Sequence, residues 1–229
     1  MNKSASYFAL NTPYPWDAID TVLLDLDGTL LDKYFDDYFW EKHVPQVFAR
    51  KHGLSSAEAE ESLLARYRSV ESTLQWTDLN YWTQQLDLDI AELKREIDHL
   101  INVHDHVLDF FDFVKSLDKR LCLITNAHST TLEIKLAKTD IGSFFDRIIC
   151  AEEVGLAKEQ LQFWHGLENL LDFDKTRTFF ADDTEKVLHA ARQYGITHLV
   201  HVARPSSKLA ARYSPDYHSI GDFSELMTP

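Results

Sequence analysis

The chain has 229 residues, of which 45% are hydrophobic and 26% are charged. This is the composition of an ordinary folded globular protein, and it excludes an intrinsically disordered chain. The 23 Lys and Arg residues are outnumbered by 37 Asp and Glu residues, which gives a formal net charge of −14. Because this charge repels phosphate backbones and anionic lipid surfaces, neither a nucleic-acid polymer nor a membrane is expected as a partner. A small anion held beside a cation is still compatible with it.

The location expected from the sequence is the cytoplasm. Residues 1–8 contain no apolar stretch of the secretory kind, and no apolar run anywhere approaches the roughly 18 residues that span a bilayer. The two cysteines, Cys122 and Cys150, lie in apolar runs where a thiol packs as a small apolar side chain. No disulfide framework is therefore expected.

Short apolar runs recur along the chain, and helical periodicity follows each of them. The runs are Thr21–Leu26, Leu121–Thr125, Arg147–Ala151, Thr178–Ala181 and Thr197–Val202. Strands that are apolar throughout and alternate with helices are typical of a parallel sheet that is covered on both faces. The predicted fold class is therefore α/β, with a parallel sheet flanked by helices.

Apolar spacing predicts two helices of this α/β region in some detail. One carries Val107, Phe110, Phe111, Val114 and Leu117. The other carries Val187, Ala190, Ala191 and Tyr194, with Gly195 placed to end it. Thr130 and Glu133 have the spacing of a capping box, which predicts a helix start after the second strand. The stretch from Arg204 to the C-terminus is weakly patterned, and no element is predicted there.

One long interval after the first strand contains no strand-like run. Its apolar residues recur at helical spacing, as in the pair Phe35 and Phe39. A connection between a strand and a helix usually takes about 2 to 6 residues, so this interval is too long to be one. Two domains are expected: an α/β core of residues 1–32 and 103–229, and an all-helical cap domain of residues 33–102.

The strongest chemical signal is the segment Asp25-Leu26-Asp27-Gly28-Thr29 at the end of the first predicted strand. Because the carboxyl ends of parallel strands face the ligand crevice of an open α/β sheet, both carboxylates are expected in that crevice. Leu26 is expected to point into the core, since side chains alternate along a strand. Gly28 permits a tight turn whose backbone N–H groups can face an anion.

Two simpler interpretations of this segment compete with a catalytic one. An Asp-Gly pair is often only a turn. Asp-x-Asp-Gly also begins calcium loops, but those need Gly at the sixth position and Glu at the twelfth, whereas here Gly is fourth and Asp36 is twelfth. The calcium loop is excluded by this spacing, and the choice between turn and site depends on the other strand ends.

Polar residues follow three further predicted strands. Thr125 and Asn126 end the second strand, and Lys158 follows the third after a short loop. Asp182 and Asp183 end the fourth strand. Taken singly, these residues are ordinary helix caps or a solvated lysine. Taken together, they bring a hydroxyl, an amide, a cation and two carboxylates to the same crevice.

In this order and spacing the four segments resemble the motifs of the haloacid dehalogenase-like (HAD) hydrolase superfamily, over nearly the whole chain. The resemblance implies a Rossmann-like core with a helical cap inserted after the first strand. It also implies roles for the strand-end residues: Asp25 as nucleophile, Asp27 as general acid/base, Thr125, Asn126 and Lys158 as substrate-binding residues, and Asp182 and Asp183 as metal carboxylates. One departure is Glu159, which follows Lys158 where many members have proline.

The chain also resembles bacterial purine-nucleotide phosphatases of the GMP/IMP nucleotidase type. The resembling segments are Asp25–Asp32, Asp37–Trp40, Asn80–Trp82, Thr125–His128, Lys158–Glu159 and Trp164–His165. This implies a 5′-nucleotidase that acts on a small phosphate monoester, GMP or IMP. A phosphatase for sugar phosphates or phosphoglycolate is one alternative, and a phosphate-sensing module without turnover is an alternative of another class. The sequence leaves the oligomeric state open.

A divalent cation is the expected cofactor, because crowded carboxylates repel one another and raise one another's pKa. Oxygen ligands and retained waters suit Mg²⁺. The expected ligands are Asp25 through a carboxylate oxygen, Asp27 through its backbone carbonyl, Asp183 directly and Asp182 through water. Asp25 would then attack phosphorus to give an aspartyl phosphate, while Asp27 protonates the leaving alkoxide.

Substrate selection is expected in the cap domain, where aromatic side chains could stack on a nucleobase. The candidates are Tyr38, Phe39, Trp40, Trp76, Tyr81 and Trp82, although aromatic residues at helical spacing more often pack in a core. Phe39 and Trp40 cannot both face the same way. His128 either touches substrate or caps a helix, whereas His104 and His106 show no metal-ligand pattern, so no zinc site is expected.

Overall fold

The structure, a computed structural model, describes residues 14–71 and 73–227, and the expectation for residues 1–8 therefore concerns a part of the chain outside it. Within the described residues, parallel strands form a six-stranded sheet in the order β3-β2-β1-β4-β5-β6. The strands are β1 (Thr21–Leu24), β2 (Arg120–Thr125), β3 (Arg147–Cys150), β4 (Thr178–Asp182), β5 (His198–Val202) and β6 (His218–Ile220). The predicted α/β fold with a parallel sheet is confirmed.

The register of the three central strands brings the candidate residues to one edge of the sheet. Leu24 of β1 pairs with Leu123 of β2 and with Ala181 of β4. Asp25 and Asp182, the next residues of their strands, therefore lie at the same level. The five predicted strands are confirmed to within two residues at each end, whereas β6 was not predicted.

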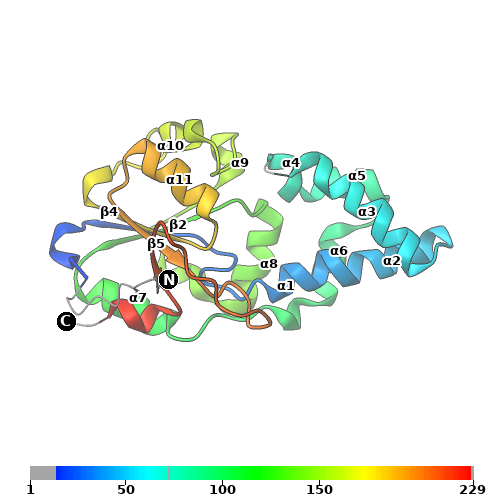
Figure 1. Ribbon diagram of the computed structural model, residues 1–229, viewed down its shortest axis with the longest axis horizontal. Helices are drawn as coiled ribbons and strands as arrows, with labels where there is room; N and C mark the ends of the chain where they lie inside the picture. Colours follow the sequence, from blue (N-terminus) through cyan, green and yellow to red (C-terminus); the bar gives the residue numbers. More distant parts are fainter. Residues whose placement is uncertain (1–13, 72, 228–229) are drawn as a thin grey trace, which may run out of the picture.

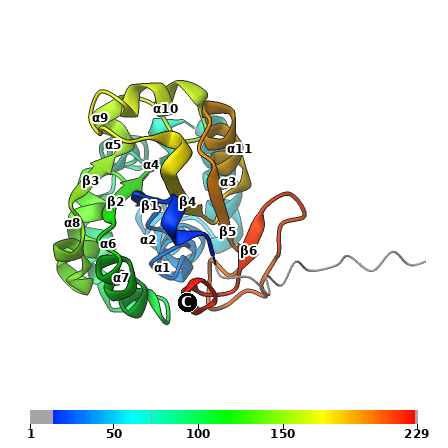
Figure 2. The same cartoon turned by 90° about the vertical axis from the view of Figure 1, so that its left-hand side faces the viewer.

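The sheet separates two layers of apolar side chains. Val22 and Leu24 face the side covered by α7 (Val107–Ser116) and α8 (Ser129–Thr139). Leu23 faces the opposite side, which is covered by α10 (Leu161–Leu167) and α11 (Glu185–Tyr194). Figure 2, which looks along the molecule from the sheet end, shows these two helical layers on either side of the strands. A shorter helix, α9 (Ala151–Val154), follows β3 directly.

Both helices predicted from spacing are confirmed as α7 and α11. Gly195 ends α11 with a φ of 113°, a left-handed conformation that glycine adopts without strain. The predicted capping box of Thr130 and Glu133 is wrong, because α8 begins earlier, at Ser129. Its cap is His128, whose Nδ1 accepts a hydrogen bond of 3.2 Å from the backbone N–H of Thr130. Thr130 therefore lies inside the first turn, where its side chain cannot act as the cap.

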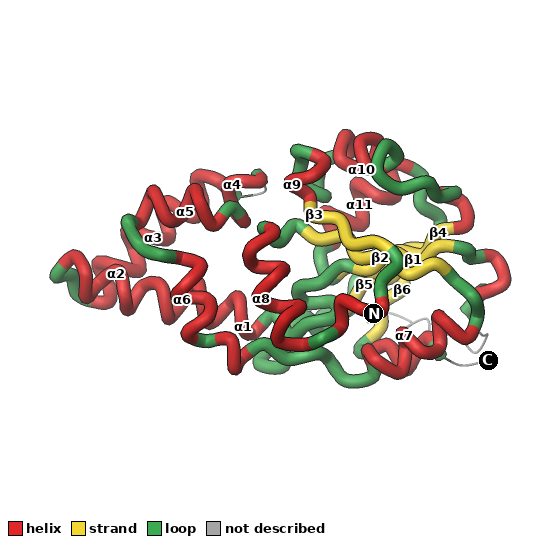
Figure 3. Tube along the Cα trace, turned by 180° about the vertical axis from the view of Figure 1, so that it is seen from behind, coloured by secondary structure: helices red, strands yellow, loops and turns green. Residues whose placement is uncertain are grey.

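The second lobe is built from helices within the described residues (Figures 1 and 3). They are α1 (Tyr34–Tyr38), α2 (Val44–His52), α3 (Ser56–Val70), α4 (Leu74–Thr77), α5 (Leu79–Leu86) and α6 (Ile90–Glu96). This helical lobe follows β1 in the chain, as expected for an inserted cap. The domain boundaries at residues 33 and 102 stay a prediction.

A π-helical turn, Phe39–His43, joins α1 to α2. Pro45 lies at the start of α2 and has no N–H to donate to the preceding turn, which accounts for the wider turn there. Phe39 is fully buried in this turn, whereas the neighbouring Trp40 is only partly buried. The two rings are nevertheless in T-shaped contact, with centroids 4.8 Å apart, and the expectation that they face different ways stays a prediction.

No helix among residues 14–71 and 73–227 combines the length and the apolar character that crossing a membrane requires.

Candidate active site

The loop after β1 carries Asp25 and Asp27 and makes a tight turn at Gly28. Leu26 between the two carboxylates is fully buried, as predicted. Gly28 has a φ of 89°, and a Cβ atom there would lie 2.7 Å from Asp183 Oδ2. Glycine is therefore required both for the backbone conformation and for the close approach of Asp183. The Gly28 N–H donates to the Leu31 carbonyl at 2.8 Å, so this N–H is not among those free to face an anion.

Lys158 lies between two of the strand-end carboxylates. Its Nζ donates to Asp25 Oδ1 at 2.5 Å and to Asp182 Oδ2 at 2.7 Å. The Lys158 side chain is 2% exposed. Burial lowers the pKa of Lys158, but the two carboxylates outweigh burial and raise that pKa above its ordinary value. Lys158 therefore carries a permanent positive charge at the floor of the site.

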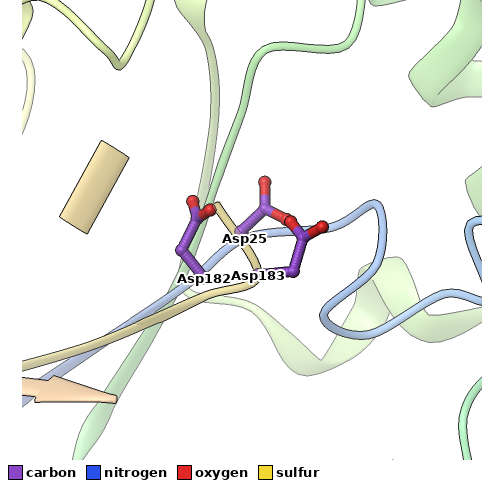
Figure 4. Close-up of side chains that lie close together, drawn as sticks. All are labelled: Asp25, Asp182 and Asp183. Atoms are coloured by element: carbon purple, nitrogen blue, oxygen red, sulfur yellow. The ribbon is translucent and has the colours of Figure 1, made fainter. Parts of the chain in front are cut away.

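The carboxylates of Asp25, Asp182 and Asp183 form the cluster shown in Figure 4, in which they lie side by side at the ends of two strands. One oxygen from each lies within 4.8 Å of the others. Burial and mutual repulsion raise the pKa of Asp182 well above its ordinary value and the pKa of Asp183 to about 7. Lys158 donates to Asp25 and Asp182, and Lys33, which is near Asp183, pairs with Asp37. The three carboxylates therefore keep an excess of negative charge, which suits a bound divalent cation.

Thr125 and Asn126 come from the end of β2. Thr125 is buried, and its Oγ1 accepts from the Ala127 N–H at 2.9 Å, which leaves the hydroxyl proton to be donated. The Asn126 side chain bridges two neighbours: Oδ1 accepts from the Lys158 N–H at 3.0 Å, and Nδ2 donates to Glu159 Oε2 at 2.9 Å. Glu159, which stands where many superfamily members have proline, thus fixes the amide that holds the Lys158 backbone.

Asp27 lies outside the three-carboxylate cluster, and its partner is a residue that the sequence analysis did not single out. Lys135 of α8 donates to Asp27 Oδ1 at 2.5 Å and to Asp36 Oδ2, from α1, at 2.6 Å. Burial, together with repulsion from Asp36 and Asp25, raises the pKa of Asp27 to about 6, although Lys135 opposes this. A carboxyl group with this pKa can both donate and accept a proton near neutral pH.

A cleft of about 1000 Å³ separates the sheet edge from the helical lobe. Asp25, Lys158 and Asp183 line its core side. On the cap side, aromatic residues line it at Trp40, Tyr67 and Trp76. The cleft is therefore charged at one end and partly aromatic at the other.

The aromatic residues proposed for the cap side divide into three groups. Phe39 and Trp82 are fully buried, in accord with the core-packing alternative. Tyr38 and Tyr81 are partly buried and are not among the residues that line the cleft. Trp40 and Trp76 do line it, and their rings are stacked with centroids 6.5 Å apart. Tyr67 was missed because it lies on α3, a helix whose apolar pattern gives no indication of the cleft.

His128 both caps α8 and lies at the edge of the cleft. Its Nε2 is 3.3 Å from the side-chain amide nitrogen of Asn80, which lies on α5 in the helical lobe. The helix-capping alternative for His128 is therefore confirmed. Contact with substrate stays a prediction.

The sequence matches a known family of enzymes along most of its length. Residues 19–195 match the haloacid dehalogenase-like hydrolases, and the chain belongs to this family of hydrolases. This confirms the resemblance found in the sequence.

Among curated relatives, the chain is similar to the GMP/IMP nucleotidase YrfG of Escherichia coli (strain K12). The two are 36% identical over 212 residues, which cover 93% of this chain and 96% of the relative. The YrfG protein of Shigella flexneri matches to the same extent.

Solved structures with low sequence identity share the fold. A HAD phosphatase from Thermococcus onnurineus superposes with a TM-score of 0.75 at 24% identity, covering 91% of this chain and 96% of that one. YfnB from Bacillus subtilis, solved bound to magnesium, has a TM-score of 0.63 at 16% identity, covering 91% of this chain and 96% of that one. L-2-haloacid dehalogenase from Xanthobacter autotrophicus has a TM-score of 0.59 at 14% identity, covering 91% of this chain and 97% of that one.

Proposed function

We propose that this hydrolase is a Mg²⁺-dependent phosphatase that releases phosphate from purine 5′-monophosphates through an aspartyl-phosphate intermediate. The observation that carries the proposal is the position of Asp25, which lies beside Lys158 and the Asp182–Asp183 pair on the floor of a cleft that has aromatic residues on its other wall. The 36% identity to a GMP/IMP nucleotidase over 93% of the chain supports the same substrate class.

In this proposal Asp25 is the nucleophile. One of its carboxylate oxygens forms a bond to phosphorus as the bond from phosphorus to the leaving alkoxide oxygen breaks. Lys158 donates to Asp25 Oδ1, which orients the carboxylate and places a positive charge where phosphate oxygens would gather. Thr125, whose hydroxyl proton is available, and Asn126, through the loop that it holds, would complete the phosphate pocket.

Asp27 acts as the general acid and then as the general base. It donates its proton to the leaving alkoxide, and it later takes a proton from the water that attacks the aspartyl phosphate. The attack by water restores the Asp25 carboxylate and releases inorganic phosphate. The position of Asp27 outside the metal cluster but two residues from Asp25 suits this division of roles.

Asp25, Asp182 and Asp183 would hold the Mg²⁺, together with the backbone carbonyl of Asp27. The fit is supported by the excess of carboxylates over cations and by the approach of their oxygens to within 4.8 Å. When bound, the ion supplies positive charge that offsets the phosphoryl group's negative charge.

A panel of monophosphates assayed with and without EDTA tests the proposal. We expect release of inorganic phosphate from GMP and IMP in Mg²⁺, little release from sugar phosphates and phosphoglycolate, and loss of activity in EDTA. Equal rates for sugar phosphates would contradict the purine preference. A complete lack of phosphate release would instead favour a non-catalytic phosphate-sensing module.

The cytoplasmic location expected from the sequence stays a prediction.

A further inference from the structure

A second buried lysine lies beside the candidate site and has no part in the function proposed above. The side chain of Lys135 is 1% exposed, yet it carries a full charge on α8. It does not line the cleft, although Asp27 and Asp36, its two partners, do. Lys135 therefore cannot bind substrate directly, and its burial needs another explanation.

The geometry of Lys135 connects the general acid/base to the helical lobe. Its ammonium group donates to Asp27 Oδ1 at 2.5 Å on one side and to Asp36 Oδ2 at 2.6 Å on the other. Asp36 belongs to α1, the first helix after the β1 loop, and its other oxygen accepts from Lys94 of α6 at 2.9 Å. The result is an alternating chain of charges, Asp27–Lys135–Asp36–Lys94, which runs from the sheet edge into the helical lobe.

The far end of this chain is held by aromatic rings. The Nζ of Lys94 lies 4.4 Å from the ring centroid of Phe39 and 4.9 Å from that of Phe35. The side chain of Lys94 is only 2% exposed. Since both rings are buried, Lys94 cannot move without disturbing the packing of α1. Asp36, and through it Lys135, is therefore held in one position.

We propose that Lys135 is a positioning residue for Asp27, and that it fixes the general acid's carboxylate relative to the helical lobe through Asp36. This inference rests on the proposed function, since it assigns Asp27 a proton-transfer role. A carboxyl group must lie within hydrogen-bond reach of the leaving oxygen to protonate it, and one held by a fixed ammonium group through Oδ1 presents Oδ2 in a defined direction. Lys135 therefore acts through Asp27 and not on the substrate.

The test uses two substrates with different leaving groups. GMP leaves an alkoxide that needs a proton, whereas p-nitrophenyl phosphate leaves a phenolate that departs without one. The kcat/KM value covers the steps up to formation of the aspartyl phosphate and excludes its hydrolysis, so the ratio of kcat/KM for the two substrates reports on the acid step alone. We expect Lys135→Met to lower kcat/KM for GMP about 10²-fold and to lower that for p-nitrophenyl phosphate by no more than about threefold.

Lys138 provides a matched control, because it lies one turn further along the same helix. It pairs with Asp98 at 3.1 Å, but its side chain is 39% exposed and it touches neither Asp27 nor Asp36. Lys138→Met is expected to leave both kcat/KM values unchanged. A further test is epistasis: in an Asp27→Asn background, Lys135→Met should lower kcat/KM for GMP no further, since the group that it positions is already gone.

The outcomes separate the inference from the proposed function. If the unaltered protein hydrolyses both substrates and Lys135→Met loses activity equally on both, or on neither, the positioning role is wrong. If the unaltered protein hydrolyses neither substrate, the proposed function fails and this inference fails with it. Should Lys135→Met not fold, Asp36→Asn carries the same comparison, with a selective loss of about tenfold on GMP expected and an equal loss on both substrates overturning the role.

Discussion

Two fully buried lysines stand on either side of the β1 loop, and each is paired with two aspartates at nearly the same distances. Lys158 lies 2.5 and 2.7 Å from Asp25 and Asp182, and Lys135 lies 2.5 and 2.6 Å from Asp27 and Asp36. The Lys158 group lies wholly within the α/β lobe: the two aspartates are at strand ends, and Lys158 is in the turn between α9 and α10. The Lys135 group joins that lobe to the helical one.

The two groups differ in charge balance, and this difference suits one group to a bound cation and the other to a fixed connection between the lobes. Around Lys158, the third carboxylate of Asp183 leaves an excess of negative charge that a cation can fill. Around Lys135, the second lysine, Lys94, balances the charges at two against two. Although burial raises the pKa of Asp36, the two lysines outweigh it and hold that pKa well below its ordinary value. The same pairing of lysine and aspartate thus serves two purposes.

The largest expected effect concerns Asp25, the proposed nucleophile beside Lys158. Asp25→Asn should lower kcat for GMP by about 10⁴-fold or more, because loss of a nucleophile removes the covalent route. The measurement is release of inorganic phosphate, with circular dichroism as a check on folding. Near-normal turnover by this variant would show that Asp25 forms no phosphoryl bond.

Replacing each lysine tests whether the stability of the two groups depends differently on magnesium. Lys158→Met and Lys135→Met should each lower the free energy of unfolding by about 3–5 kcal/mol, because carboxylates are left buried without their partner. Added Mg²⁺ should restore much of the stability of Lys158→Met, since a cation can take over from the ammonium group. Lys135→Met keeps its magnesium site, so it should gain only what the unaltered protein gains, and its deficit relative to the unaltered protein should stay the same. Thermal unfolding of both variants and of the unaltered protein at several Mg²⁺ concentrations measures the two deficits. If the deficits of both variants shrank equally, magnesium would not distinguish the Lys158 group from the Lys135 group.

Magnesium should also stabilise the unaltered protein through the Lys158 side alone. At a Mg²⁺ concentration 100 times its Kd, the free energy of unfolding should rise by about 2.7 kcal/mol. Asp183→Asn should abolish the rise, and Asp36→Asn should keep it. If Asp36→Asn abolished the rise in stability instead, the ion would be bound beside Lys135 and not beside Lys158.

The aromatic residues on the cap side of the cleft give the helical lobe a second way to influence the reaction, independent of Lys135. Trp76→Ala should raise KM for GMP by about 5- to 150-fold, which corresponds to about 1–3 kcal/mol of stacking, and should leave hydrolysis of p-nitrophenyl phosphate nearly unchanged. Trp82→Ala is a poor substitute because that ring is fully buried and its loss would unfold the lobe. An unchanged KM for Trp76→Ala would remove the stacking role.

The smallest effect concerns Asp32, whose carboxylate is held by hydrogen bonds from Tyr34 and from both the side chain and the backbone of Ser207. Its Oδ1 accepts from Tyr34 at 2.9 Å and from Ser207 at 3.0 Å. Burial raises the pKa of Asp32, but these hydrogen bonds and His104 outweigh it and lower the pKa below 3.8. Its stabilisation is therefore fully present above about pH 4 and is lost as the pH falls through the lowered pKa.

Asp32→Asn should reduce stability at pH 7 by about 1 kcal/mol and flatten the acid limb of the stability curve. Urea unfolding between pH 3 and pH 7 measures the change. If the free energy of unfolding of this variant fell as steeply at low pH as that of the unaltered protein, the acid loss of stability would come from other carboxylates.

The Lys158 group was predictable from the sequence, and the Lys135 group was not. Asp25 and Asp182 come at the ends of apolar strands, and parallel strands deliver their ends to one edge whatever the intervening chain does. Lys158 was expected after a short loop, but the helix α9 (Ala151–Val154) separates it from β3. The partners of Lys135 depend on how α1 packs against α8, which no local pattern specifies. A signal did exist: Lys135 shares the buried face of α8 with Thr131 and Leu132, and a lysine on an apolar face is unusual.

Other differences have similarly local causes. Strand β6 has only three residues, of which His218 and Ser219 are polar, so it lacks the apolar run that identified the other five strands. The start of α8 was misplaced because an imidazole nitrogen serves as the cap in place of a hydroxyl group. Glu159 was noted as a departure, but its hydrogen bond to Asn126 depends on two loops that meet only in the folded protein.

The hydrophobic core of the α/β lobe continues into the helical lobe. One continuous cluster of buried side chains includes Leu24 of β1, Phe110 of α7, Phe39 of the π-helical turn and Trp82 of α5. Deletion of the helical lobe would therefore expose a large apolar surface. The truncated hydrolase should precipitate and not remain as a smaller active enzyme. Replacing the helical lobe with that of another protein would likewise require a matching apolar interface with the sheet, as well as chain ends in compatible positions.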